Sequence, residues 1–210
     1  MPDSLSPVAA HCAAHGDGKP MSARCPWAYN AGDAMLAYHD EEWGKPCHDL
    51  RDLFELLCLE GLQAGLSWST ILNKREHLRT VFHEFEPSLV ASMADDIPTL
   101  MADPGIIRNR RKIEAIIHNA QLVDGMDKAG ESFDEYTWTF VGGTIRVNRP
   151  ADAGAIPPSD PTSMAMSKAL KTKGFKFVGP TIMYAFMQSV GMVNDHVHDC
   201  FLCPPICAEY

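Results

Sequence analysis

The chain has 210 residues, of which 46% are apolar, and a formal net charge of −9. This length and content suit one well-filled hydrophobic core, or two small lobes that share one. The acidic balance argues against a general polyanion binder, because non-specific DNA affinity comes from basic residues, but it does not exclude a DNA-binding face where basic residues cluster. The sequence shows neither the apolar region of a secretory signal nor an uninterrupted membrane-spanning run, so we expect a soluble, cytoplasmic protein with no membrane contact.

Residues 1–24 are rich in Ala, Pro, Gly and Ser and show no hydrophobic periodicity. This composition predicts a disordered N-terminal extension that precedes a single folded domain of residues 25–210. The first part of that domain, residues 25–48, concentrates aromatic, Cys and His side chains without a long amphipathic pattern. We expect loops and a short helix there.

From Asp49 the hydrophobic pattern becomes helical. One face of this helix carries three leucines and an acid: Leu53, Leu56, Leu57 and Glu60. Glu60 therefore projects toward the core, near the middle of the most apolar stretch of the chain. A buried carboxylate usually finds a partner, shifts its pKa or serves a site. Ser67 suits the N-cap of a following helix, which we expect to run from Trp68 to about Phe82.

The remaining pattern is also helical. Helices are expected at residues 131–141, from Thr162 or Ser163 to Gly174, and from Gly179-Pro180 to Gly191. The loop of residues 142–160 has room for a short extended piece at residues 144–147. With about seven or eight helices and no convincing sheet, the chain is predicted to be all-α.

Residues 96–123 are predicted to form a tight helical hairpin, with Gly105 in its turn. In a helix–hairpin–helix motif, glycine lets the backbone approach a phosphate, and the N–H groups that open the next helix bind it. Basic residues without an acid among them follow the turn: Arg108, Arg110, Arg111 and Lys112. A second such cluster comprises Lys168, Lys171, Lys173 and Lys176. Two solvated helix faces that bind nothing are the alternative.

Two pairs of side chains near the two ends of the domain suggest a metal site. One pair is Cys25 with His39. The other is His196 with Cys200, two residues whose spacing of four positions is one helical turn. Cys2His2 is a closed ligand set typical of structural zinc, and it would clip the N-terminal segment to the C-terminus. Spacing leaves the fourth ligand ambiguous, because Cys203 and Cys207 lie close by, and it also allows ordinary packing residues.

Four aromatic residues are candidates to surround Glu60: Trp27, Tyr38, Trp43 and Trp68. A flat aromatic slot with one carboxylate suits a cationic, planar heterocycle, since the rings stack on it and the carboxylate accepts its N–H groups. The alternative is an ordinary aromatic core around a hydrogen-bonded Glu.

Together these residues resemble the DNA-3-methyladenine glycosylase I family of the helix–hairpin–helix glycosylase superfamily. The resemblance runs across roughly residues 24–203. Its stretches are Arg24-Cys25-x-Trp27, Ala37-Tyr38-His39-Asp40-x-Glu42-Trp43-Gly44, Leu59-Glu60-Gly61-x-Gln63-Ala64-Gly65-Leu66-Ser67-Trp68, Gly105-Ile106-Ile107-Arg108-Asn109, Lys173-Gly174-Phe175-Lys176-Phe177-Val178-Gly179 and Val193-Asn194-Asp195-His196. Residues 1–24 and Cys207 have no counterpart, and some relatives carry an aromatic residue where Met35 stands.

The resemblance implies an all-helical, two-lobed fold and one structural zinc held by Cys25, His39, His196 and Cys200, which resolves the fourth ligand. It implies that a flipped N3-methyladenine stacks on Trp68 and bonds to Glu60 and Tyr38, with Trp27 and Trp43 lining the pocket. It also implies a set of DNA contacts. These comprise Gly65 and Leu66 at the gap left by the flipped base, the hairpin residues Gly105, Ile107 and Arg108, and Lys176.

The implied activity is base excision repair by a monomer on alkylated double-stranded DNA. Free 3-methyladenine is released and an abasic site remains. The base already carries positive charge and leaves easily, so catalysis is mainly selection and base flipping, with Glu60 holding the base. No lysine nucleophile is implied, so no strand cleavage is expected. A non-catalytic binder of distorted DNA and a zinc-dependent hydrolase are the competing hypotheses.

Overall fold

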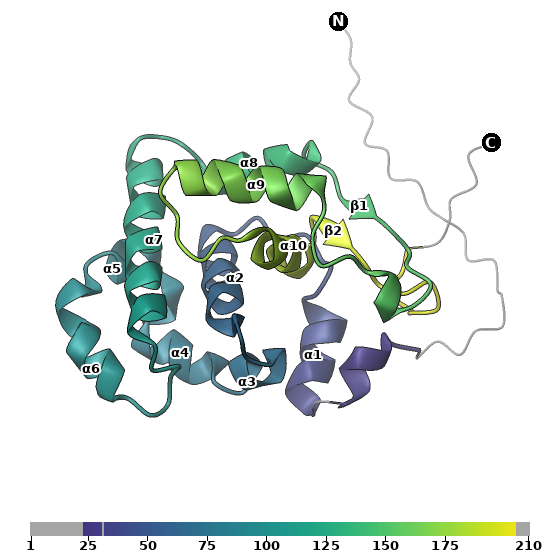
Figure 1. Ribbon diagram of the computed structural model, residues 1–210, viewed down its shortest axis with the longest axis horizontal. Coiled ribbons are helices and arrows are strands. Elements are labelled where there is room, and N and C mark those ends of the chain that lie inside the picture. Colours follow the sequence, from purple (N-terminus) through teal and green to yellow (C-terminus); the bar gives the residue numbers. More distant parts are fainter. Residues whose placement is uncertain (1–22, 31, 205–210) are drawn as a thin grey trace, which may run out of the picture.

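The computed structural model describes residues 23–30 and 32–204 (Figure 1). Almost all of the predicted N-terminal extension and Cys207 lie outside the described residues. Within the described part of the chain, no helix has both the length and the apolar character needed to cross a membrane.

The α-helices are α1 (Asp33–Glu41), α2 (Leu50–Gln63), α3 (Trp68–Leu72), α4 (Arg75–Val81), α5 (Pro87–Val90), α6 (Ile97–Ala102), α7 (Arg110–Lys128), α8 (Phe133–Trp138), α9 (Pro161–Thr172) and α10 (Pro180–Ser189). Short 3-10 turns are η1 (Pro26–Asn30), η2 (His83–Phe85), η3 (Met93–Asp96), η4 (Thr139–Val141) and η5 (Ala153–Ala155). Two short strands, β1 (Arg146–Val147) and β2 (Val193–Asn194), pair in parallel. The fold is therefore mostly helical, as predicted, with one two-residue strand pair in addition.

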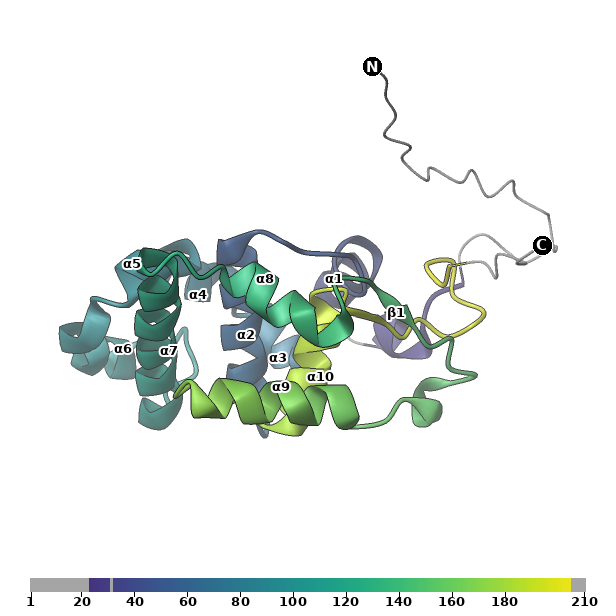
Figure 2. The same cartoon turned by 90° about the horizontal axis from the view of Figure 1, so that it is seen from above.

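Helix α2 is the centre of the molecule, and it packs against α3, α7, α8 and α10 (Figures 1 and 2). Its first turn is capped by Asp49, whose side chain accepts from the N–H of Asp52. Every residue from Leu53 to Leu62 is buried. A helix that is surrounded on all sides in this way places any polar side chain it carries inside the protein.

Two hydrophobic clusters form two lobes. The larger one collects α2, α7, α8, α9 and α10 with the short helices between α3 and α7. The smaller one joins the N-terminal segment to the end of the described chain, and its buried members are Cys25, Met35, Tyr38, Trp43, Leu72, Val197 and Cys200. Trp68 packs against both clusters, so it lies at the boundary between the lobes.

The structure differs from the sequence prediction after Trp68. The single helix expected from Trp68 to Phe82 is two helices, α3 and α4, because the chain turns at Asn73 and Lys74. The N–H of Asn73 still bonds to Ser69, but Lys74 bonds to Ile71 in a tighter turn. The break gives α4 its own direction, and it brings two arginines of α4 to α2.

Candidate active site and metal centre

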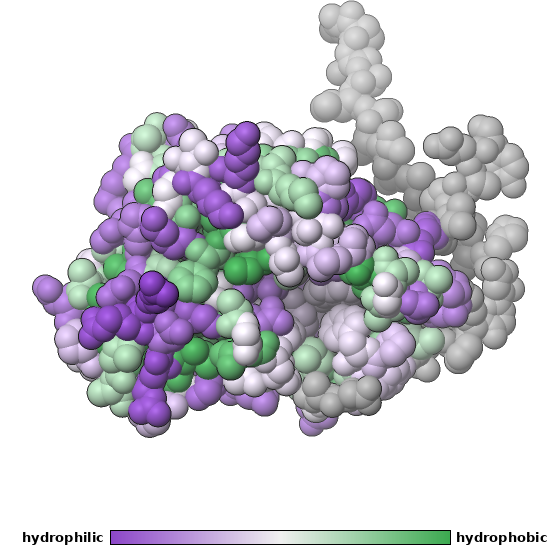
Figure 3. Space-filling model, in the orientation of Figure 1, coloured by the Kyte–Doolittle hydropathy of each residue, from purple (hydrophilic) through white to green (hydrophobic). Residues whose placement is uncertain are grey.

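A pocket of about 280 Å³ opens between the two lobes. Its walls come from η1, α1, α2, α3 and α10, and from the turn after α1. The lining residues are Trp27, Met35, Tyr38, Trp43, Glu60, Gln63, Trp68, Ala185 and Gln188. The space-filling view shows this face hollowed between α1, α3 and α10 (Figure 3). The five residues predicted from the sequence to form a slot are thus brought together.

Glu60 is the acid of this pocket. Its side chain comes from the C-terminal half of α2 and only 4% of the residue is exposed. Burial raises the pKa of Glu60 to about 8. No described residue forms a hydrogen bond or an ion pair with its carboxylate. The buried environment therefore disfavours the ionised form of Glu60. A cation placed beside the carboxylate would lower its pKa again.

Aromatic side chains face one another around this acid. The rings of Trp27 and Trp43 lie 5.0 Å apart, edge to face, and those of Tyr38 and Trp68 lie 5.1 Å apart. Burial, and next the nearby Glu60, raise the pKa of Tyr38, so its hydroxyl remains a proton donor. The indole Nε1 of Trp68 is buried without an acceptor in the described structure. An unpaired buried donor is costly, and a bound acceptor would satisfy it.

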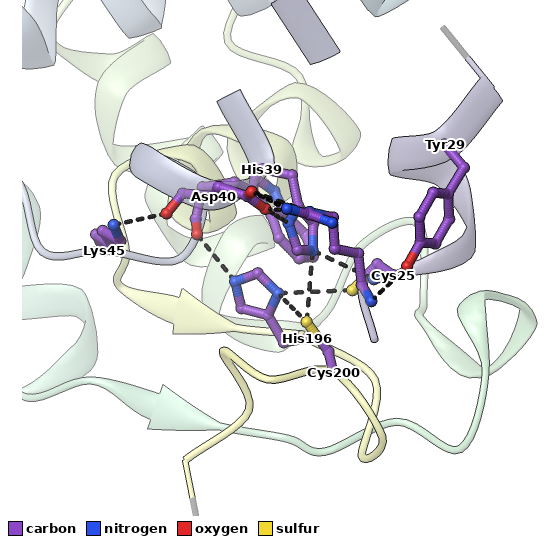
Figure 4. Close-up of polar contacts among 9 residues, drawn as sticks. Cys25, Tyr29, His39, Asp40, Lys45, His196 and Cys200 are labelled. Carbon is purple, nitrogen blue, oxygen red and sulfur yellow. Dashed lines mark hydrogen bonds and ion pairs between the residues drawn. The ribbon is translucent and has the colours of Figure 1, made fainter. Parts of the chain in front are cut away.

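Next to the pocket, four buried side chains converge: Cys25, His39, His196 and Cys200 (Figure 4). Their ligand atoms all lie within 4.8 Å of one another. The Cys200 Sγ is 3.3 Å from His196 Nδ1 and 3.4 Å from His39 Nε2, and Cys25 Sγ is 3.5 Å from His196 Nδ1. Ligands of a tetrahedral zinc ion are separated by roughly 3.4–3.8 Å, as the usual bond lengths require. The group is therefore able to bind a metal ion.

The second nitrogen of each histidine is also held. His39 Nδ1 lies 2.8 Å from Asp40, which in turn forms an ion pair with Arg24, and His196 Nε2 lies 3.0 Å from the carbonyl oxygen of Trp43. Such outer contacts fix the ring orientation and the tautomer of metal-binding histidines. The arrangement leaves His39 Nε2 and His196 Nδ1 facing the two sulfurs.

The two thiols also differ in acidity. A hydrogen bond from Cys25, with further bonds to His196 and His39, holds the pKa of Cys200 far below its usual range. The same bond to Cys200, together with burial, raises the pKa of Cys25. One thiolate is thus stabilised by the cluster itself. Because thiolates are the metal-binding form of cysteine, this donor set fits a metal cation.

Comparisons with known proteins agree with this geometry. The sequence model of the methyladenine glycosylase family matches residues 27–203. The chain belongs to this family. It is 50% identical to DNA-3-methyladenine glycosylase 1 of Escherichia coli over 182 residues, which is 86% of this chain and 97% of that protein. Its activity is that of a DNA-3-methyladenine glycosylase in base excision repair.

Two solved structures are similar throughout. One is the crystal structure of a 3-methyladenine DNA glycosylase I, with 50% identity and a TM-score of 0.84 over 87% of this chain and all of that one. The other is a tyrosine-to-phenylalanine variant of a 3-methyladenine DNA glycosylase I in complex with 3-methyladenine. It is 39% identical, with a TM-score of 0.80 over 85% of this chain and 97% of that chain.

In this glycosylase, the turn predicted to meet DNA lies beside the pocket, between α2 and α3. Gly65 has a φ of +80°, which favours glycine, and Leu66 is 40% exposed. The ammonium of Lys112 donates to the carbonyl oxygens of Leu62 and Ala64 at the end of α2. Lys112 was expected to add to a basic DNA-binding surface. It is instead buried, because it caps the C-terminus of α2 and holds this turn.

Gly105 lies in the turn between α6 and α7. A Cβ on Gly105 would lie 2.3 Å from His77, and the N–H of Gly105 already donates to Asp103. A side chain at this position would therefore have to displace the exposed ring of His77. Arg108 is exposed and Ile107 is partly exposed, as a DNA contact requires. Contact between DNA and Gly105, Ile107 or Arg108 remains a prediction.

A second helical hairpin, α9–α10, carries Lys176 in its turn. The side chain of Asn119 on α7 holds this turn by bonding to both the N–H and the carbonyl oxygen of Lys176. Gly179 caps α10 without a side-chain hydrogen bond, whereas Asn109 caps α7 with its own side chain. The start of α10 therefore keeps N–H groups for an external anion.

Sequence reasoning missed two pocket residues of α10, Ala185 and Gln188, and did not assign Gln63 a role. Ala185 and Gln188 lie three positions apart, so they share a helix face. That face was readable from the sequence, but its position against Glu60 depends on how α10 packs on α2.

Proposed function

We propose that this glycosylase flips N3-methyladenine out of alkylated double-stranded DNA into the pocket between the lobes. There it hydrolyses the bond between the base and the deoxyribose, leaving an abasic site without strand cleavage. Residues 25–210 would act as one catalytic domain and as a monomer, in the cytoplasm of a bacterial cell. The observation that carries the proposal is Glu60, a buried carboxylate in an aromatic pocket that has no partner among residues 23–30 and 32–204.

The chemistry of the base matches these groups. N3-methyladenine in DNA is a planar cation, so it gains charge complementarity from the Glu60 carboxylate and stacking from Trp68, with Trp27 and Trp43 as further walls. Tyr38 stays protonated and can donate a hydrogen bond to a ring nitrogen. A neutral purine would bring no charge to offset the cost of ionising the buried Glu60. The pocket would therefore select the cation before any bond is broken.

The proposed hydrolysis needs little acid catalysis. The glycosidic bond breaks with its electron pair moving to the cationic base, which leaves as neutral 3-methyladenine. A water oxygen then bonds to C1′ of the sugar and loses a proton. No lysine lines the described pocket. We therefore expect no covalent sugar intermediate and no lyase step.

Leu66 is proposed to fill the gap left in the duplex by the flipped base, with Gly65 allowing the close approach. Gly105, Ile107 and Arg108 on one hairpin and Lys176 on the other are proposed to contact the phosphate backbone. The uncapped start of α10 supports the contribution of the second hairpin.

We propose zinc as the ion of the Cys2His2 group. All four tetrahedral positions are supplied by protein side chains, so the ion would hold structure and leave no site for a reactive water. Its role would be to tie η1 and α1, which carry Trp27 and Tyr38, to the segment after β2. Filled coordination also disfavours a zinc-dependent hydrolase.

Incubation with methylated duplex DNA tests the activity. We expect free 3-methyladenine in solution and strands that break only after alkali treatment. Strand breaks without alkali would contradict the absence of a lyase step, and no released base would refute the proposed reaction.

Metal analysis tests the zinc site. We expect roughly one zinc per chain, and its loss in Cys200→Ser with a lower melting temperature. Cys203→Ser is the matched control, since Cys203 lies three positions away and outside the four converging ligands. Equal metal content in both variants would contradict the assigned ligand set.

A further inference from the structure

Gln188 lines the pocket from α10, together with Glu60 and Gln63 of α2. Its amide nitrogen is already used: Nε2 donates to Asp195 Oδ2 at 2.7 Å. An amide side chain has one donor end and one acceptor end. With the donor end bound to Asp195, the carbonyl oxygen is the end left for the pocket. Within the described structure, no group donates to that oxygen.

Asp195 is a rigid anchor for this amide. It is 1% exposed, and it also accepts from the hydroxyl of Tyr184 at 2.8 Å and from Nδ2 of Asn148 at 2.7 Å. Three donors converge on the two carboxylate oxygens, so the group is compensated and cannot turn. This fixes which end of the Gln188 amide binds Asp195. A flipped amide would place two oxygens against each other.

We propose that Gln188 is a specificity-determining residue that selects a 6-amino purine over a 6-oxo purine, and that Asp195 is the positioning residue that fixes its amide. The inference rests on the proposed function of the pocket. Adenine carries an amino donor at C6, whereas guanine carries an oxygen acceptor there. The amino group can donate to Gln188 Oε1, but the oxygen of a methylated guanine would meet an acceptor and leave both unpaired.

This role differs from that of Glu60. The carboxylate attracts the positive charge that methylated adenine and methylated guanine share, so this attraction does not separate the two bases. An amide oxygen of fixed orientation can separate them, because it reads a donor against an acceptor. A site built for a specific hydrogen bond rejects the analogue that lacks it.

The test is competitive release of 3-methyladenine and 3-methylguanine from one methylated duplex DNA. The measured quantity is kcat/KM for 3-methyladenine divided by kcat/KM for 3-methylguanine. We expect Gln188→Leu, which keeps the bulk and removes the amide, to lower this ratio about 10-fold. Asp195→Asn should shift the ratio in the same direction by less, since the freed amide can turn. In the double variant the effects should not add, because both act through the same oxygen.

Asn148→Ala is the matched control. It removes a donor from the other oxygen of Asp195 without freeing Gln188, so it should lower stability and leave the ratio unchanged. Metal content is measured for every variant, because Asp195 precedes His196. If Asp195→Asn loses metal, the Gln188→Leu ratio alone decides.

An unchanged ratio in Gln188→Leu, or a parallel fall of both kcat/KM values, would overturn the inference. Failure of the wild-type protein to release 3-methyladenine would instead overturn the proposed reaction, so the two failures are distinguishable.

Discussion

Helix α2 buries two glutamates five positions apart, and they have opposite surroundings. Glu55 is 2% exposed and Glu60 is 4% exposed. Glu55 accepts from Arg75 Nε at 2.5 Å and from Arg79 Nε at 3.0 Å, so its charge is compensated within the protein. Glu60 has no such partner in the described structure, and burial raises its pKa to about 8.

The difference shows that burial alone does not mark a functional acid. Arg75 also binds Glu42 after α1 with two hydrogen bonds, so the Glu55 network joins three segments and serves the fold. Glu60 contributes no such contact and faces the pocket. A buried carboxylate that lacks a partner in the protein is the one that a ligand can complete.

The largest expected effect separates the two acids by activity. Glu60→Gln should lower kcat/KM for release of 3-methyladenine by about 10²–10³, because the variant keeps the shape and loses the charge. Glu55→Gln should keep kcat/KM near the wild-type value in protein that is folded. Equal losses in both variants, measured with methylated duplex DNA, would remove the functional distinction.

The second expected effect separates them by stability. Glu55→Gln should lower the free energy of unfolding by about 3 kcal/mol, because it leaves two arginines with a weakened partner at a buried position. Urea unfolding measures this. Glu76→Gln is the control, since Glu76 binds the same Arg79 at an exposed site and its removal should change little.

The third effect is on pH. Since the carboxylate form of Glu60 attracts the cationic base, kcat/KM should rise about 10-fold per pH unit below pH 8 and level off above it. The Glu60→Gln profile should be flat over this range. A wild-type kcat/KM that falls above pH 8 would show that the protonated acid is the active form.

The smallest effect is a gain in stability for Glu60→Gln. The folded-state pKa of Glu60 lies above its usual value of 4.5, so the folded protein holds the proton more tightly and loses stability as pH rises from about 4.5 to 8. Glutamine does not titrate. The variant should therefore gain about 1 kcal/mol relative to the wild type between pH 5 and pH 6. Parallel melting curves at the two pH values would contradict this.

The sequence predicted much of the fold because its main signals are local. Helix spacing, the Ser67 cap and the spacing of Gly179 and Gly191 depend on neighbours in the chain, and these elements formed as expected. The break at Asn73 and Lys74 was missed because the apolar stripe continues across it. The extended piece expected at residues 144–147 contains β1, but its pairing with β2 was missed because Arg146 and Val193 meet only through tertiary packing.

The site shows the same division. Glu60 was predicted to be a site residue because an acid within an apolar run can be recognised in the sequence itself. Glu55 lies in the same run, and only the folded chain shows that arginines of α4 compensate it. Lys112 was predicted to be a DNA-binding residue because its neighbours are basic. Its ammonium instead donates to carbonyl oxygens at the end of α2, about 50 positions away in the sequence. The orientation of the Gln188 amide depends on its hydrogen bond to Asp195, and the sequence does not show this contact.

The Cys2His2 group has a further consequence for the order of folding. Cys25 and His196 are separated by 171 positions, so closing the loop between them carries a large entropic cost that falls late in synthesis. The wall that bears Tyr38 and Trp43 would stay open until the last ligands emerge from the ribosome. A partly made chain that lacks His196 and Cys200 would therefore carry its hairpins without a finished pocket, and base removal would begin only after these residues have been made.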